Sequence, residues 1–142
     1  EQVLADFVRC VGDVLPTAED VVTAVADGRC YVGVTTEDLA MQAAASGLSV
    51  TVIYPREGSV VQPDCAAIIA DCAHEDNARA FIDFLLSGEV QERLTRQYRR
   101  TVFTPLGDAS LPHALAYDPY AAGAHQAETL DIWSSLTAEE TP

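Results

Sequence analysis

The chain contains no lysine, and its eight basic residues are all arginines, whereas 22 residues are acidic. The formal net charge is therefore −14 over 142 residues. Proteins that bind nucleic acid attract its phosphates with a surplus of basic residues, and this chain has the opposite balance. The sequence therefore argues against a nucleic-acid partner.

Motifs typical of catalytic and metal sites are also missing. No GxSxG, P-loop, GxGxxG or HExxH pattern occurs, and the three histidines, His74, His113 and His125, stand far apart in the sequence. The cysteines form no CxxC pair of the kind that binds zinc. The sequence predicts a protein that is not an enzyme, with no catalytic residues, no cofactor and no metal site.

Long apolar runs are absent as well. None approaches the ~20 residues that a membrane-spanning helix needs, and the first residues do not have the layout of a signal peptide. Hydrophobic residues still make up 49% of the chain, enough to build the core of one domain or of a large part of one.

The four cysteines give two different expectations. Cys65 and Cys72 bracket an apolar run that is expected to be extended, which would hold them ~20 Å apart and unpaired with each other. Cys10 and Cys30 flank a predicted helix, and they fit either a disulfide or two small buried side chains.

Apolar residues at three- and four-residue spacing predict six helices. The clearest begins at Glu75, carries Phe81, Ile82 and Leu85 on one face, and ends at Ser87-Gly88. The others are expected at 3–11, 17–28, 36–47, from residue 90 to the following arginines, and around 130–136. Residues 104–120 contain three prolines and predict an irregular connection.

Short apolar, β-branched runs predict buried strands at 30–34, 50–54 and 65–70. The first two flank the helix expected at 36–47, so together they form a βαβ unit with parallel strands. We therefore expect an α/β fold, a parallel sheet with helices on both faces.

Two polar clusters follow the first two predicted strands, where α/β proteins hold their ligands. One is Thr35-Thr36-Glu37, at a helix start whose N–H groups favour an anionic or strongly polar ligand, and the other is Glu57-Gly58-Ser59. Each member also has a simpler interpretation, the threonines as helix caps, Glu37 as a helix-start acid and Glu57 as a loop acid. Four arginines at 93, 96, 99 and 100 form either a basic patch or a solvated helix end.

The order and spacing of several segments resemble the C-terminal portion of the solute-binding proteins of ABC importers. The similarity is to the type II group of periplasmic binding proteins, which includes ferric-iron and sugar-phosphate binders, and it runs from about Phe7 to Arg100. The segments that carry it are Val25-Ala-Asp-Gly28, Tyr31-Val-Gly-Val34, Ala40-Met41, Ala45-Ser-Gly47, Val52-Ile-Tyr-Pro-Arg-Glu-Gly-Ser59, Asn77-Ala-Arg-Ala-Phe-Ile-Asp-Phe-Leu-Leu-Ser87 and Val90-Gln91.

The resemblance implies two α/β lobes that close over a ligand. Residues 1–54 would belong to lobe two, 55–64 would cross between the lobes, and 65–142 would return into lobe one with C-terminal helices. Thr35, Thr36 and Glu37 would be contacts from lobe two, while Glu57, Gly58 and Ser59 would line the return crossing.

The resemblance also implies the ligand class and the setting. Ferric binders carry adjacent tyrosines where this chain has Thr35-Thr36-Glu37, so a sugar phosphate or another polar or anionic solute is expected. A ferric-iron binder of the same group and a ligand-sensing regulatory domain are the alternatives. The partners implied are a small-molecule ligand and a membrane permease, and the location is extracellular or periplasmic, with a membrane tether in the full-length form.

Members of the group are much longer than 142 residues, so we expect the chain to be a fragment of a longer protein. Strands that lack their neighbours would leave edges and apolar faces uncovered. Self-association of the chain is therefore a further expectation.

Overall fold

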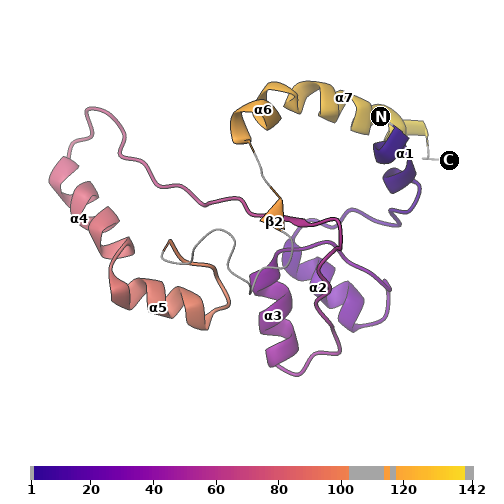
Figure 1. Cartoon of the computed structure of the whole chain (residues 1–142), viewed down its shortest axis with the longest axis horizontal. Coiled ribbons are helices and arrows are strands. Elements are labelled where there is room, and N and C mark those ends of the chain that lie inside the picture. The colour runs from indigo at the N-terminus through magenta and orange to yellow at the C-terminus, as the bar shows by residue number, and fades with distance from the viewer. Residues whose placement is uncertain (1, 103–113, 116–117, 140–142) are drawn as a thin grey trace. The chain divides into compact units, whose positions relative to one another are not determined.

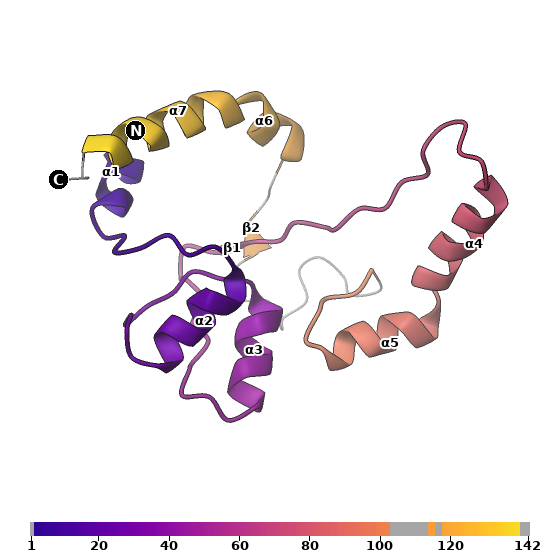
Figure 2. The same cartoon turned by 180° about the vertical axis from the view of Figure 1, so that it is seen from behind.

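The computed structural model describes residues 2–102, 114–115 and 118–139. These residues form seven helices and two short strands, and the chain divides into two compact units. Unit 1 comprises residues 1–17 and 116–142, and unit 2 comprises residues 18–115. The elements, labelled in Figures 1 and 2, are α1 (Gln2–Val8), α2 (Ala18–Ala26), α3 (Glu37–Ala45), β1 (Ser59–Val60), α4 (Glu75–Leu85), α5 (Gly88–Arg96), β2 (Ala114–Leu115), α6 (Pro119–Ala124) and α7 (Gln126–Glu139).

Unit 1 is built from the two ends of the chain. Helix α1 packs against α7, where the ring of Phe7 lies 6.3 Å from that of Trp133 and Val8 is buried. Helix α6 precedes α7 and begins with a clear cap, since Asp118 accepts hydrogen bonds from the backbone N–H groups of Tyr120 and Ala121.

The first half of unit 2 is a pair of packed helices, α2 and α3. Val22, Ala24 and Ala43 supply the buried side chains of this pair. The backbone of Gly33 lies against α2 so closely that a Cβ atom there would come within 2.6 Å of Val21 Cγ1. Residues 30–34 therefore run along α2, and glycine is needed for that approach.

The second half of unit 2 contains the α4–α5 pair. Ser87 separates the two helices and caps α5 by accepting a hydrogen bond from the N–H of Val90. Gln91 is buried and satisfied, because it donates to the carbonyl of Leu85 and accepts from the N–H of Val102. One glutamine thus fixes the end of α4 and the segment after α5 to the same helix.

All six predicted helices are confirmed, with boundaries within a few residues of the expected ones. Helix α6 begins inside the predicted irregular connection, so the prediction missed it; residues 104–113 and 116–117 of that connection lie outside the described part of the chain. Acidic residues in the first turn of α2, α3, α4 and α5 are placed favourably for the helix dipole.

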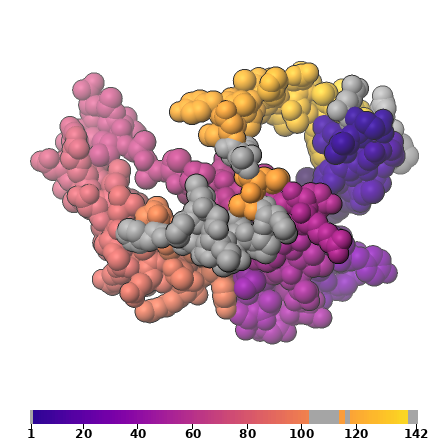
Figure 3. Space-filling view, viewed as in Figure 1, coloured from indigo at the N-terminus to yellow at the C-terminus, as the bar shows by residue number. Residues whose placement is uncertain are grey.

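The three predicted buried strands are wrong. Residues 30–34, 50–54 and 65–70 form no strand, and none of their apolar side chains is buried: Tyr31 is fully exposed, and Val32 and Ile53 are 82% exposed. The composition of these runs favours a strand, but a strand also needs a neighbour that accepts and donates its backbone hydrogen bonds. No such neighbour lies beside these runs within the described ranges. Figure 3 draws the third run, in the segment leading to α4, as a line of exposed atoms.

The structure does contain one parallel pair of strands, in which Ser59 lies opposite Ala114 and Val60 opposite Leu115. The coarser prediction, helices combined with parallel strands, is therefore confirmed. The two-lobe arrangement and the division at 1–54, 55–64 and 65–142 stay predictions, and the compact units have their boundaries at other residues.

Candidate functional site

The first polar cluster lies where it was expected, at the start of α3. Thr36 is the N-cap residue, in an extended backbone conformation, but its side chain makes no capping hydrogen bond and is exposed. The hydroxyl of Thr35 donates to the carbonyl of Ala18 at the start of α2, over 3.3 Å. Thr35 therefore ties the two helices together, whereas Thr36 presents a hydroxyl to solvent.

Glu37, the first residue of α3, is held by two side chains from distant parts of the sequence. Arg100 donates from Nε to Oε2 over 2.8 Å and from Nη2 to Oε1 over 2.7 Å. Tyr54 donates from its hydroxyl to Oε1 over 2.5 Å. Both carboxylate oxygens are thus engaged, and the arginine contact is bidentate, a strong geometry for this pair.

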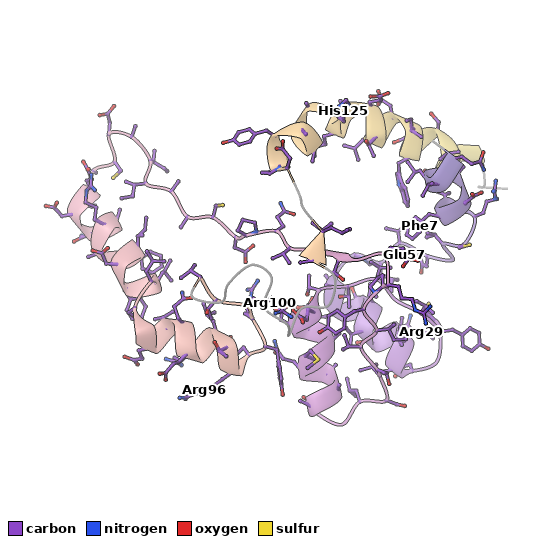
Figure 4. The ribbon with its side chains drawn as sticks, in the orientation of Figure 1. Phe7, Arg29, Glu57, Arg96, Arg100 and His125 are labelled. Atoms are coloured by element: carbon purple, nitrogen blue, oxygen red, sulfur yellow. The ribbon has the colours of Figure 1, made fainter. Side chains whose placement is uncertain are left out.

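This cluster of Glu37, Tyr54 and Arg100, which we call the carboxylate clasp, is half-buried. The side chain of Glu37 is 27% exposed and that of Arg100 is 24% exposed. Figure 4 shows Arg100 beside α3, whereas Arg96, on α5, points away from that helix. Partial burial excludes much of the competing water and strengthens the ion pair relative to one on the open surface.

The clasp alters the pKa values of its two titratable acids. Burial by itself raises the pKa of Glu37, but the hydrogen bonds from Arg100 and Tyr54 and the charge of Arg100 outweigh burial and the neighbouring charge of Asp38. The pKa of Glu37 is therefore lower than usual. The hydrogen bond to Glu37 raises the pKa of Tyr54, and burial and the charge of Glu37 act in the same direction, against a smaller opposing effect of Arg100. At neutral pH the clasp holds a carboxylate and a protonated phenol.

The segment after α5 approaches α3 at more than one point. Arg99 lies 3.6 Å from the carboxylate of Asp38 and 2.9 Å from that of Asp64. Gln42 donates to the backbone carbonyl of Gln97 over 3.1 Å. Within the described ranges neither α4 nor α5 packs on α2 or α3, so these polar contacts join the two halves of unit 2 at α3.

The second polar cluster forms a turn into β1. The N–H of Gly58 donates to the carbonyl of Pro55 over 3.2 Å, and Gly58 has a φ of +121°, which a residue with a side chain rarely adopts. Ser59 is then the first residue of β1, and Glu57 is exposed. Among the described residues no hydrogen bond or ion pair links Glu57 or Ser59 to Thr36 or Glu37.

Tyr54 nevertheless brings the two clusters into one neighbourhood. It contacts Glu37 directly, and the turn that carries Glu57 begins at the next residue, Pro55. Neither partner of Glu37 was predicted from the sequence, since Tyr54 lies in a run expected to be a buried strand and Arg100 lies among arginines that fit a helix end. The sequence does contain one indication that Arg100 lies beyond the helix. It follows Leu94, the last apolar residue at helical spacing, by more than one helical turn.

Within the residues that the structure describes, the remaining candidate groups do not gather into a site. His74 is the N-cap residue of α4 without a side-chain capping bond, His125 lies 3.5 Å from Glu128, and His113 lies outside the described residues. In the part of the chain that the structure describes, no three histidine, cysteine or acidic side chains are placed to hold a metal ion. All four cysteines are free thiols, so the disulfide considered for Cys10 and Cys30 is not formed.

Nor does any helix within residues 2–102, 114–115 and 118–139 combine the length and apolar character that crossing a membrane requires.

Comparison with known proteins gives one match, to a family model. Neither a curated protein nor a solved structure shows significant similarity to the chain. The family model described as bacterial extracellular solute-binding protein, however, matches residues 2–123, which include both polar clusters and the carboxylate clasp. The chain therefore belongs to the family of bacterial extracellular solute-binding proteins.

Proposed function

We propose that this chain is the substrate-binding component of an ABC importer and captures a small polar or anionic solute, with a sugar phosphate as the favoured class. The family match over residues 2–123 supports the solute-binding role. The proposed site is the cleft between the two lobes of a type II binding protein. Extracellular or periplasmic location fits the family, and we include a membrane tether in the full-length protein.

The observation that carries the anionic class is the position of Arg100 beside the first polar cluster. A chain with a net charge of −14 repels anions at long range, so a local cation is required to bind one. Arg100 supplies that cation next to Glu37, and Tyr54 adds a hydroxyl. Guanidinium and hydroxyl groups are the partners that phosphate oxygens prefer.

We assign the ligand contacts to the two polar clusters and the clasp. Thr36 offers an exposed hydroxyl and Ser59 begins β1 directly after the turn. The other members of the proposed site are Thr35, Glu37, Glu57 and Gly58. Hydroxyls and backbone N–H groups of this kind bind the oxygen atoms of sugars and phosphates without a catalytic group.

Two partners complete the proposal. One is the permease of the importer, which would receive the solute. The other is a second copy of this chain, because large apolar side chains at residues 30–34, 50–54 and 65–70 are uncovered in the described structure. Sedimentation velocity of the purified chain tests this second partner, and a species that stays monomeric at micromolar concentration contradicts it.

Isothermal titration calorimetry tests the ligand class. We expect heat of binding from glucose 6-phosphate and little from glucose, while ferric citrate tests the iron alternative. Thr36→Ala should weaken glucose 6-phosphate binding about five- to tenfold, the usual effect of one hydrogen bond. Thr129→Ala is the matched control, because that hydroxyl donates to a backbone carbonyl in unit 1. Binding of ferric ion alone would contradict the proposal.

A further inference from the structure

We propose that Arg100 and Tyr54 form the seat for the anionic group of the solute, and that Glu37 occupies this seat as a built-in competitor until the solute displaces it. This inference rests on the proposed function. It also changes the role of Glu37, from a residue that binds the solute to one that the solute must replace.

The seat formed by Arg100 and Tyr54 already holds an anion. Two donors of Arg100 and the hydroxyl of Tyr54 converge on one carboxylate, with all three distances between 2.5 and 2.8 Å. Three donors directed at two oxygen atoms match one face of a phosphate or a carboxylate equally well. The structure thus shows the seat in use, with a carboxylate of the chain itself as its occupant.

Contacts other than those of Glu37 hold the seat in place when Glu37 leaves it. The segment that carries Arg100 is held at α3 by separate contacts, namely those of Arg99 with Asp38 and of Gln97 with Gln42. Tyr54 directly precedes a turn that is closed by the hydrogen bond from the N–H of Gly58 to the carbonyl of Pro55. None of these contacts uses the Glu37 carboxylate.

The exposure of the seat and the charge of a phosphate both favour displacement of Glu37. Glu37 and Arg100 each retain about a quarter of their side-chain exposure, so an anion from solvent reaches the guanidinium without unfolding of α3. A phosphate monoester carries more negative charge than a carboxylate at neutral pH and has three acceptor oxygens, so it interacts more strongly with the same donors. The tethered carboxylate gains in turn from its high local concentration, which makes it an effective competitor.

Calorimetry of the full 142-residue chain with glucose 6-phosphate, inorganic phosphate and glucose tests the inference. Glu37→Gln keeps the shape of the side chain but removes its charge, and we expect the dissociation constant for glucose 6-phosphate to fall about tenfold. Glu92→Gln is the matched control, because it removes the same charge from an exposed arginine pair on α5 and leaves the seat intact. Its dissociation constant should stay within about twofold of the unaltered chain.

A second measurement does not depend on the folding of the Glu37 variant. In the unaltered chain labelled with ¹⁵N-arginine, the side-chain N–H signal of Arg100, assigned with Arg100→Lys, should shift saturably with glucose 6-phosphate and not with glucose. If the chain binds glucose 6-phosphate but Glu37→Gln binds it no more tightly and the Arg100 signal does not move, the inference is wrong and the proposed function stands. If neither phosphate compound binds either protein, the anionic class and the inference fail together.

Discussion

Replacing Arg100 by methionine should destabilise unit 2 by about 1.5–2 kcal/mol. Methionine keeps much of the packing of the arginine stem but leaves the Glu37 carboxylate with the Tyr54 hydroxyl as its remaining partner in the clasp. A hydrogen-bonded charged group contributes about 1.5–3 kcal/mol, and we take the lower part of this range because Glu37 is 27% exposed and solvent screens the pair.

A double-mutant cycle isolates the interaction itself. Urea unfolding at pH 7, followed by far-UV circular dichroism, gives the free energies of unfolding of Arg100→Met, Glu37→Gln and the double variant. We expect a coupling energy of about 1 kcal/mol between Glu37 and Arg100. The Arg96–Glu92 pair is the control, because its atoms are 3.4 Å apart and both side chains are about three-quarters exposed.

The control cycle should give a coupling of about 0.5 kcal/mol or less, as exposed helix pairs do. If the two couplings are equal, the clasp is an ordinary surface ion pair, and the reasoning from its burial and bidentate geometry is refuted.

Four further outcomes follow from the same structure. The clasp stabilises the folded chain fully above pH 4.5, the ordinary pKa of a glutamate. Because the pKa of Glu37 is lower in the folded chain, this stabilisation should be lost as the pH falls from 4.5 through the folded pKa. In urea unfolding, Glu37→Gln should remove this part of the dependence of stability on pH. The pKa of Tyr54 is raised, so absorbance titration at 295 nm should show a tyrosine that ionises above the ordinary pKa of 10.0, and Tyr54→Phe should remove this step. Gly33→Ala should cost about 1–3 kcal/mol, since its Cβ would meet two valines of α2, whereas Gly123→Ala, in open space on α6, should stabilise by up to about 1 kcal/mol. Gln91→Ala should cost about 1–2 kcal/mol in urea unfolding, because it removes the buried glutamine whose part-buried hydrogen bonds hold the carbonyl of Leu85 and the N–H of Val102.

The helices could be predicted from the sequence because their signals are local. The apolar spacing after Glu75 defines α4, and Ser87 marks the start of α5 through a capping bond only three residues long. Helix α6 was missed although Asp118-Pro119 is a typical start signal, since the prolines and glycine before it dominated the interpretation.

The strands could not be predicted in the same way, because a strand depends on its neighbour. Val32 and Ile53 have the side chains of a buried strand, yet both are 82% exposed, and no strand among the described residues pairs with them. The pair that does form joins Ser59 to Ala114, 55 residues later, and no local pattern marks this contact.

The candidate site shows the same limit. The sequence placed Thr36 and Glu37 correctly at the start of α3, because capping residues and first-turn acids are local features. It did not find the partner of Glu37, because Arg100 lies 63 residues further along the chain. Two of the four arginines at 93–100 have different surroundings in the structure. Arg96 forms an exposed ion pair on α5, whereas Arg100 binds Glu37 of α3 in the carboxylate clasp.

The central claim is that a small anionic solute binds at the first turn of α3. The most direct test is a ¹H–¹⁵N correlation spectrum of the labelled chain titrated with glucose 6-phosphate. The account predicts saturable shifts at residues 35–37, 54–59 and 100, with unit 1 unchanged. Shifts confined to other residues, or none at millimolar glucose 6-phosphate, would contradict it.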